Sequence, residues 1–271
     1  MPTFTVNRYK ILVKYRLAKF KRHIKSAIDL RKIGLKYNII KYIFQKDYRE
    51  TFFQKRREYY RKKRNDLGYF STETSPKDLF NEMLFDKVYD FKDFVPKKGD
   101  VVVDVGAYYG DSAIWWAKEF GANVIAFEPL KEAYNEVIEN AKLNKVDDKI
   151  KVYNIALGDG EKIWGGKGLR DMFNSSNKEG MLSTNRLDDL NLKKVEILKI
   201  DVEGFELVVL KGAGKTIERL GPKIILETHN RDLRKECDRF LVNLRYRLEI
   251  TGRTIISTDG SEITNLFYAR R

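Results

Sequence analysis

Residues 101–111 read VVVDVGAYYGD, and this stretch decides the fold. The apolar run formed by Val101, Val102, Val103 and Val105 is typical of a strand that is buried on both faces of a parallel sheet. Glycines follow at 106 and 110, where the chain must turn sharply, and the N-terminus of the next helix offers free N–H groups to a ligand. The stretch therefore predicts the first strand–turn–helix unit of an α/β domain.

The same alternation continues towards the C-terminus. We expect strands over about 123–127, 150–156, 196–200 and 223–226, and helices over about 112–120, 131–143, 205–217 and 232–244. Two further strands, 246–251 and 263–269, have no helix between them and predict an antiparallel hairpin at one edge of the sheet. The long stretch between the third and fourth strands is suited to form a substrate wall. The fold class is therefore α/β, with a Rossmann-like, mostly parallel, doubly wound sheet.

The N-terminal quarter differs from the rest of the 271-residue chain. Residues 1–70 contain 21 Lys and Arg against 5 Asp and Glu, a balance of +16, so the remaining residues balance at −2. Apolar residues at three- and four-residue steps predict helices over 5–64. Ser75 and Pro76 are typical helix-start residues and predict a short helix to about Phe85. We therefore divide the chain into a basic helical segment, 1–70, and a catalytic domain, 71–271.

Three interpretations of the basic segment stay open. Its 14 aromatic residues and many cations would suit an anionic membrane surface, with residues 1–64 lying at the interface. They would also suit RNA, which we favour less. The third interpretation is a solvated helical hairpin that packs on the catalytic domain.

The sequence contains no apolar run near the ~18 residues that cross a bilayer. Neither does a signal-peptide core follow the first basic residues. The single cysteine, Cys237, fits a reducing compartment. We therefore expect a cytoplasmic protein, peripheral at the membrane if it binds one.

Acidic residues follow the first two strands. Asp104 ends the first strand, where an acid would repel a pyrophosphate but attract the ammonium and sulfonium groups of S-adenosylmethionine (SAM). Glu128 follows 24 residues later, at the end of the second strand, where a carboxylate can accept hydrogen bonds from both ribose hydroxyls of an adenosine. The pattern favours a nucleotide or SAM site over a purely structural turn.

The fourth and fifth strands add more polar residues. Asp201 and Glu203 follow the fourth strand, and alternate residues of an extended chain point the same way. Glu227 and His229 end the fifth strand, where the histidine could act as a base near neutral pH. Glu203 could instead only complement the dipole of the next helix, and His229 could be only a structural hydrogen-bonding group.

The motifs VVVDVGAYYGDSA, IAFEP, NIALGDG, RLDDL, ILKIDVEGFELVVLKGA and IILETH stand in this order over residues 100–230. In sequence and spacing they resemble the FkbM family of SAM-dependent methyltransferases. The resemblance implies a class I methyltransferase fold, with seven strands and an antiparallel final strand. It also implies SAM as cofactor and O-methylation of a hydroxyl, commonly on a sugar or a polyketide-like small molecule. We expect the acceptor here to be a sugar, a glycan or a glycolipid.

The resemblance also assigns roles. Asp104, Gly106 and Gly110 would flank the methionine end of SAM, Glu128 would hold its ribose, and Ala156 to Asp159 would lie near the adenine. Ala107, Pro129 and Asp201 complete the expected cofactor-binding set. Asp201 and Glu203 would border the methyl-transfer cleft, with Glu227 and His229 opposite. One departure is Tyr108, where the family usually carries a small or amide residue.

The expected reaction is an in-line displacement that depends on alignment and on a base for the hydroxyl proton. His229, Asp201 and Glu203 are the candidate bases. We expect no resident metal, although Asp201, Glu227 and Asn230 offer oxygen atoms that Mg²⁺ would accept.

Two other functions stay open. One is an RNA ribose 2′-O-methyltransferase that uses the basic segment. This hypothesis is weakened because such enzymes commonly use a lysine near the transferred methyl group, and no lysine ends the fifth strand. The other is a non-catalytic SAM- or nucleotide-binding module, against which the acids at both strand ends argue.

Overall fold

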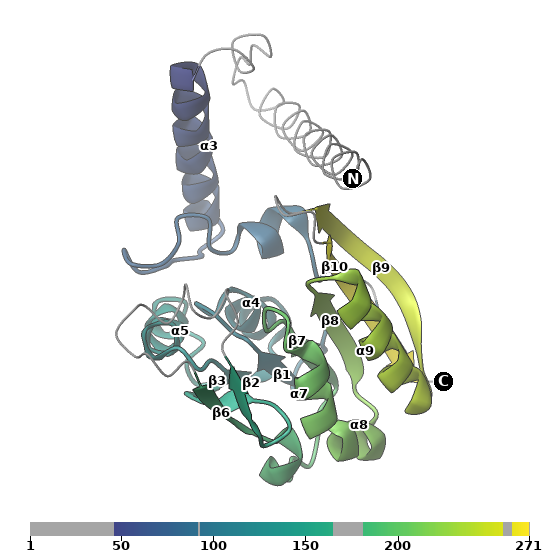
Figure 1. Ribbon diagram of the computed structural model, residues 1–271. Coiled ribbons are helices and arrows are strands. Elements are labelled where there is room, and N and C mark those ends of the chain that lie inside the picture. Colours follow the sequence, from purple (N-terminus) through teal and green to yellow (C-terminus); the bar gives the residue numbers. More distant parts are fainter. Residues whose placement is uncertain (1–45, 92, 165–180, 257–261, 271) are drawn as a thin grey trace, which may run out of the picture.

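The computed structural model describes residues 46–91, 93–164, 181–256 and 262–270 (Figure 1). The helices predicted over residues 5–45 lie outside the described residues, but the pattern that continues from them forms α3 (Lys46–Asp66). Figure 1 shows α3 projecting from the body of the molecule on the side of α4 (Asp111–Phe120) and α5 (Lys131–Leu143). Among the residues that the structure describes, none of the helices combines the length and the apolar character of a membrane span.

A seven-stranded sheet forms the centre of the molecule. Its strands are β1 (Val101–Val105), β2 (Asn123–Phe127), β3 (Ile150–Tyr153), β7 (Ile197–Ile200), β8 (Lys223–Thr228), β9 (Tyr246–Ile256) and β10 (Glu262–Arg270). The order is β3-β2-β1-β7-β8-β10-β9, and β10 runs antiparallel to both of its neighbours. The predicted Rossmann-like sheet with its closing hairpin is therefore confirmed.

Helices cover both faces of this sheet because the strand side chains alternate between two apolar layers. Val102 packs into one buried cluster with α4, α5 and residues from 69–94, whereas Val103 and Val105 pack into a second cluster. The second cluster lies against α7 (Glu206–Gly212), α8 (Gly214–Leu220) and α9 (Arg231–Asn243). This double coverage explains why β1 is apolar at nearly every position.

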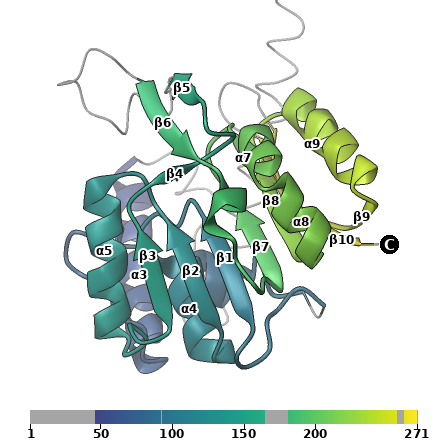
Figure 2. The same cartoon turned by 90° about the horizontal axis from the view of Figure 1, so that it is seen from below.

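The long connection after β3 contains a small sheet of its own. β4 (Ala156–Leu157), β6 (Met181–Asn185) and β5 (Lys162–Trp164) pair in that order, and the 3₁₀ helix η2 (Leu187–Leu190) follows. Figure 2 shows β5 and β6 projecting beyond the main sheet. The predicted third strand over 150–156 is therefore two pieces, since β3 ends at Tyr153 and Ala156 begins β4.

Two predicted helices differ from the structure. The helix expected from Ser75 to Phe85 is a series of turns followed by the π-helix η1 (Glu82–Asp86). Phe80 interrupts it with a left-handed backbone, φ 72°, and its ring is fully buried. The Ser75 hydroxyl does not cap a helix but accepts from Asn140 and donates to Glu136. Burial of an aromatic ring overrides the helix-start pattern here.

The helix expected over 205–217 is divided into α7 and α8 at Ala213. A Cβ at Gly212 would lie 1.6 Å from the carbonyl oxygen of Gly158, so the end of α7 packs directly on the chain after β4. The division of the chain at residues 70 and 71 stays a prediction. Tyr69, just before that boundary, is 1% exposed and belongs to the core of the domain.

Candidate functional site

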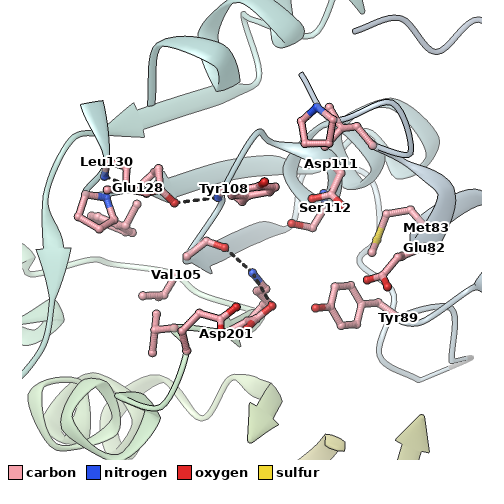
Figure 3. A pocket seen from close by; sticks show the side chains of 18 of the residues that line it. Glu82, Met83, Tyr89, Val105, Tyr108, Asp111, Ser112, Glu128, Leu130 and Asp201 are labelled. Carbon is pink, nitrogen blue, oxygen red and sulfur yellow. Dashed lines mark hydrogen bonds and ion pairs between the residues drawn. The ribbon is translucent and has the colours of Figure 1, made fainter. Parts of the chain in front are cut away.

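A cavity of about 520 Å³ lies at the carboxyl ends of β1, β2 and β7. The strand order reverses between β1 and β7, which is where open α/β sheets bind ligands. Figure 3 shows Glu128 at one end of the cavity and Glu82, Met83 and Tyr89 at the other, with Asp201 between them. The segment before β1 therefore forms one wall, although no motif had marked it as part of a site.

The turn between β1 and α4 is fixed against the turn after β7. Gly106 has φ 79°, and a Cβ there would lie 1.9 Å from the carbonyl oxygen of Asp201. The Gly106 and Ala107 N–H groups both donate to the carbonyl oxygen of Phe127. Gly110, at φ 88°, is the residue from which α4 begins. Only glycine tolerates this combination of positive φ and close backbone approach at 106.

Asp104 is fully buried and does not line the cavity. Its carboxylate accepts from the Ser112 hydroxyl at 2.6 Å and lies 3.0 Å from the Lys199 ammonium. Lys199 also donates to the Gly106 carbonyl oxygen at 2.7 Å. Burial lowers the pKa of Lys199, but Asp104 and Asp201 outweigh burial and raise it above its usual value. The lysine is therefore a permanent cation that ties β1, β7 and the glycine turn together.

Glu128 lines the cavity from the end of β2 and is 5% exposed. Its two carboxylate oxygens accept from the backbone N–H groups of Tyr108 and Leu130, each at 2.9 Å (Figure 3). Burial raises the pKa of Glu128 to about 7, although these two hydrogen bonds lower it. The carboxylate is thus held in place at the cavity wall, next to Pro129 and Ala156, which line it too.

Four predicted residues meet at the ends of β7 and β8. His229 Nε2 lies 3.3 Å from a carboxylate oxygen of Glu203, 3.8 Å from Asp201 and 3.9 Å from Glu227. Burial raises the pKa of Asp201, and the neighbouring Glu227 raises it further. Burial also raises the pKa of Glu227, which accepts a hydrogen bond from Asn265.

Glu206 is the buried partner of His229, and the sequence did not predict it. Glu206 is 0% exposed, and its carboxylate lies 2.9 Å from His229 Nδ1 and accepts from the Gly204 N–H at the same distance. Burial lowers the pKa of His229, but Glu206 and the facing carboxylates raise it to about 9. An acidic residue in the first turn of a helix was the one available signal, and it is equally typical of simple dipole complementation.

The cavity is strongly acidic. Seven carboxylates and one ammonium group line it: Asp78, Glu82, Asp86, Asp111, Glu128, Asp201, Glu203 and Lys199. Burial raises the pKa of Asp111 to about 6, which Lys199 partly offsets. SAM carries an ammonium and a sulfonium, so this charge suits it. The glycine at 106 and the fixed carboxylate of Glu128 also suit it, and together these observations show that the residues present fit this donor.

The structure places the predicted residues in three groups. Gly106, Glu128, Pro129, Ala156, Asp201 and Glu203 line the cavity; Asp104, Ala107 and Gly110 lie behind it; Glu227 and His229 lie beside Asp201. Their individual roles stay predictions. Asn230 does not join the cluster, because its side chain caps α9 by accepting from Asp232 and Leu233. Asp201, Glu227 and His229 offer ligand atoms within 4.8 Å of one another.

Parts of the chain are similar to known proteins. The profile of the family described as the methyltransferase FkbM domain matches residues 104–248, just over half of the chain. The tRNA (guanine(37)-N(1))-methyltransferases of Macaca mulatta and Macaca fascicularis are each 35% identical over 104 residues, which cover 38% of this chain and 20% of theirs. The crystal structure of methyltransferase FkbM from Methylobacillus flagellatus KT is 19% identical with a TM-score of 0.48, and the match covers 70% of this chain and 47% of that one. The chain therefore spans about a fifth of the curated relatives and about half of the crystallised protein.

Proposed function

Because the chain belongs to the FkbM family of SAM-dependent methyltransferases, we propose that it methylates a hydroxyl of a sugar, a glycan or a glycolipid. The observation that carries this proposal is the charge of the cavity, whose lining contains seven carboxylate side chains and one ammonium group. Carboxylates accept hydrogen bonds from the hydroxyls of a neutral sugar, and they attract a cationic donor.

SAM, when bound, supplies an electrophilic methyl group on a positively charged sulfur. The chain itself orients the acceptor and takes up its proton. Asp201 is the proposed base, since it lines the cavity and its raised pKa makes it a better proton acceptor than an ordinary carboxylate. His229 has a pKa of about 9 and is therefore mostly protonated near neutral pH. It supports the reaction as a cation that holds Asp201, Glu203 and Glu227 around it.

An RNA ribose is a less favoured acceptor. The curated relatives are named as tRNA methyltransferases, and residues 1–70 are basic. However, a ribose within RNA carries a phosphate on each side, so at least one of them would face the carboxylates of the acidic cavity and be repelled. A non-catalytic binding module is disfavoured because Asp201 remains at the cavity with a raised pKa.

Methyl transfer from radiolabelled SAM to a cell extract, separated into glycan, lipid, RNA and protein fractions, tests the acceptor class. We expect label in the glycan or glycolipid fraction. Label confined to RNA would contradict the proposal.

The role of Asp201 is tested by Asp201→Asn, which keeps the side-chain shape. We expect kcat to fall by about 10²–10⁴-fold, as for loss of a general base, while the Kd of SAM changes only a few-fold. Glu203→Gln is the matched control: it removes a neighbouring carboxylate whose side chain is 58% exposed, and we expect a smaller loss. Equal kcat values for wild type and Asp201→Asn would eliminate Asp201 as the base.

We also propose a cytoplasmic location, with residues 1–64 at an anionic membrane surface. The +16 balance of residues 1–70 supports this, since each cation near an anionic surface contributes about 1 kcal/mol. Flotation with vesicles that contain phosphatidylserine should recover the full chain, whereas neutral vesicles should not. Equal recovery with both would contradict the proposal.

A further inference from the structure

A second cavity, of about 600 Å³, lies between the C-terminal half of α3 and residues 70–77. Its charged lining residues are Arg57, Arg61, Arg64 and Lys77, with Glu58 and Glu73. Four cations against two carboxylates give it a positive balance, opposite to that of the acidic cavity. Residues 57, 61 and 64 are spaced four and three apart along α3, so one face of the helix presents all three guanidinium groups.

Arg64 has a buried side chain with one unpaired hydrogen-bond donor. It is 4% exposed, and one terminal nitrogen donates to the Leu79 carbonyl oxygen. Its Nε is buried and has no hydrogen-bond partner among the described residues. Burial lowers the pKa of Arg64, Asp78 partly restores it, and the nearby Arg61 lowers it further. A buried guanidinium with an unused donor is costly unless an acceptor completes it, and phosphate oxygens match its fork geometry.

The two cavities are neighbours along the chain. Ser75 and Lys77 line the basic cavity, while Pro76 and Asp78 line the acidic one. Leu79, whose carbonyl oxygen accepts from Arg64, also lines the acidic cavity. Residues 75–79 therefore form a wall that the two cavities share, and a molecule that reaches around this wall could place a hydroxyl in the acidic cavity and an attached anionic group among the arginines.

We propose that the basic cavity binds a phosphate or diphosphate group carried by the acceptor sugar, and so holds that sugar while its hydroxyl is methylated. This proposal rests on the proposed function, because it identifies the acceptor class of the same site. A closed set of three arginines and one lysine suits one compact phosphate group. An extended RNA backbone would need a continuous basic path, which the acidic cavity interrupts.

Titration calorimetry of the full chain with sodium pyrophosphate, without SAM, tests the site directly. We expect binding that weakens roughly tenfold or more in the double variant Arg57→Gln with Arg61→Gln, since each charged hydrogen bond contributes a large share of the affinity. Lys55→Gln with Lys62→Gln is the matched control, because it removes the same charge from the same helix outside this cavity. We expect its affinity to stay within about twofold, as for other surface charges.

Arg64→Lys provides a second variant that keeps the charge but loses the Nε donor, and it should also weaken pyrophosphate binding. If Arg64→Lys does not fold, the double variant at the exposed residues Arg57 and Arg61 still tests the proposal. No heat from pyrophosphate at millimolar concentration would overturn the proposal. Equal losses in the two double variants would also overturn it, since they would show only diffuse charge attraction.

Two further binding measurements identify the kind of molecule that carries the phosphate group. Tighter binding of a nucleoside diphosphate sugar than of pyrophosphate would indicate a soluble acceptor. Binding of vesicles that contain phosphatidic acid, when it is lost in the Arg57 and Arg61 double variant but kept in the Lys55 and Lys62 double variant, would indicate a lipid-linked one. Tighter binding of a single-stranded RNA, lost equally in both double variants, would overturn the proposal in favour of an extended RNA surface. A separate SAM titration keeps failure of this site distinct from failure of the proposed function.

Discussion

A single buried carboxylate, that of Glu206, fixes two parts of the site. It contacts His229 Nδ1, and it accepts from the Gly204 N–H in the turn that carries Glu203. Glu203 has a left-handed backbone conformation, φ 54°, which is unfavourable for a residue other than glycine, and the hydrogen bond to Glu206 helps to hold the turn in this conformation. We infer that Glu206 is a positioning residue that keeps the imidazole facing Asp201 and protonated.

Glu206→Gln tests this positioning role through the titration of His229. The carboxylate is the largest favourable cause of the raised pKa, so we expect the pKa to fall from about 9 towards its usual value. The chain has two histidines, and a His23→Gln background leaves a single imidazole signal for NMR titration. A midpoint that stays near pH 9 in Glu206→Gln would contradict the role, and retention of the midpoint by Glu206→Asp would support it.

At this scale the sequence predicted which polar residues meet but not all of their partners. Asp201, Glu203, Glu227 and His229 lie together because the carboxyl ends of adjacent parallel strands share one edge of the sheet. The Asp104–Lys199 pair and the buried position of Glu206 were not predicted. Both depend on which way a side chain turns inside the packed domain, and spacing along the chain does not determine that direction.

Among the elements, the turn between β1 and α4 is closely packed against the end of β7. Gly106 lies against the Asp201 carbonyl oxygen, and its own carbonyl oxygen accepts from Lys199. The turn thus connects the first strand to the end of β7. A displacement of this turn would therefore also move Asp201, which lines the acidic cavity.

Gly106→Ala should destabilise the fold strongly and abolish SAM binding. Gly99→Ala is the matched control, because Gly99 also has a positive φ, 83°, but nothing lies within 4 Å of an added Cβ. We expect Gly99→Ala to cost about 1–2 kcal/mol from backbone strain alone, and Gly106→Ala to cost clearly more. Urea unfolding measures both, and equal losses would show that close packing at Gly106 contributes nothing.

Helices and strands were predicted well where the spacing of apolar residues stayed regular, and poorly where contacts with distant residues interrupt a helix. The core strands and α4, α5 and α9 lie close to their predicted ranges. The helix predicted from Ser75 does not form, because Phe80 adopts a left-handed backbone conformation and its ring is buried in the core. The helix over 205–217 was divided because the Gly212 backbone packs on Gly158. Neither contact is visible as a local pattern.

On the scale of the whole molecule, charge is separated between neighbouring cavities. The acidic one holds Glu128 and Asp111, whose pKa values burial raises to about 7 and about 6, and the basic one holds the α3 arginines. This separation suits a reaction in which the acidic cavity holds a cationic donor next to the acceptor hydroxyl, while the basic cavity holds an anionic group attached to the same acceptor.

The raised pKa values predict how stability depends on pH in the absence of a ligand. The folded state of Glu128 binds a proton more tightly than the unfolded state, so its contribution is present below about pH 4.5 and is lost as pH rises through about 7. Each pKa unit corresponds to about 1.4 kcal/mol, so the decline should be measurable by urea unfolding at pH 5 and pH 7.5. Glu128→Gln should show a smaller decline than wild type, whereas an equal decline would contradict the assignment.

A titration with SAM tests directly whether the cavity at the ends of β1, β2 and β7 binds this donor. Titration calorimetry of the full chain with SAM and with its demethylated product, S-adenosylhomocysteine, should each give one-to-one binding. Glu128→Gln should weaken both by about tenfold or more, through loss of a charged hydrogen-bond acceptor in a buried site. Exposed Glu139→Gln, on the outer face of α5, should leave both unchanged. The absence of heat from either ligand with the folded wild-type protein would contradict the central claim.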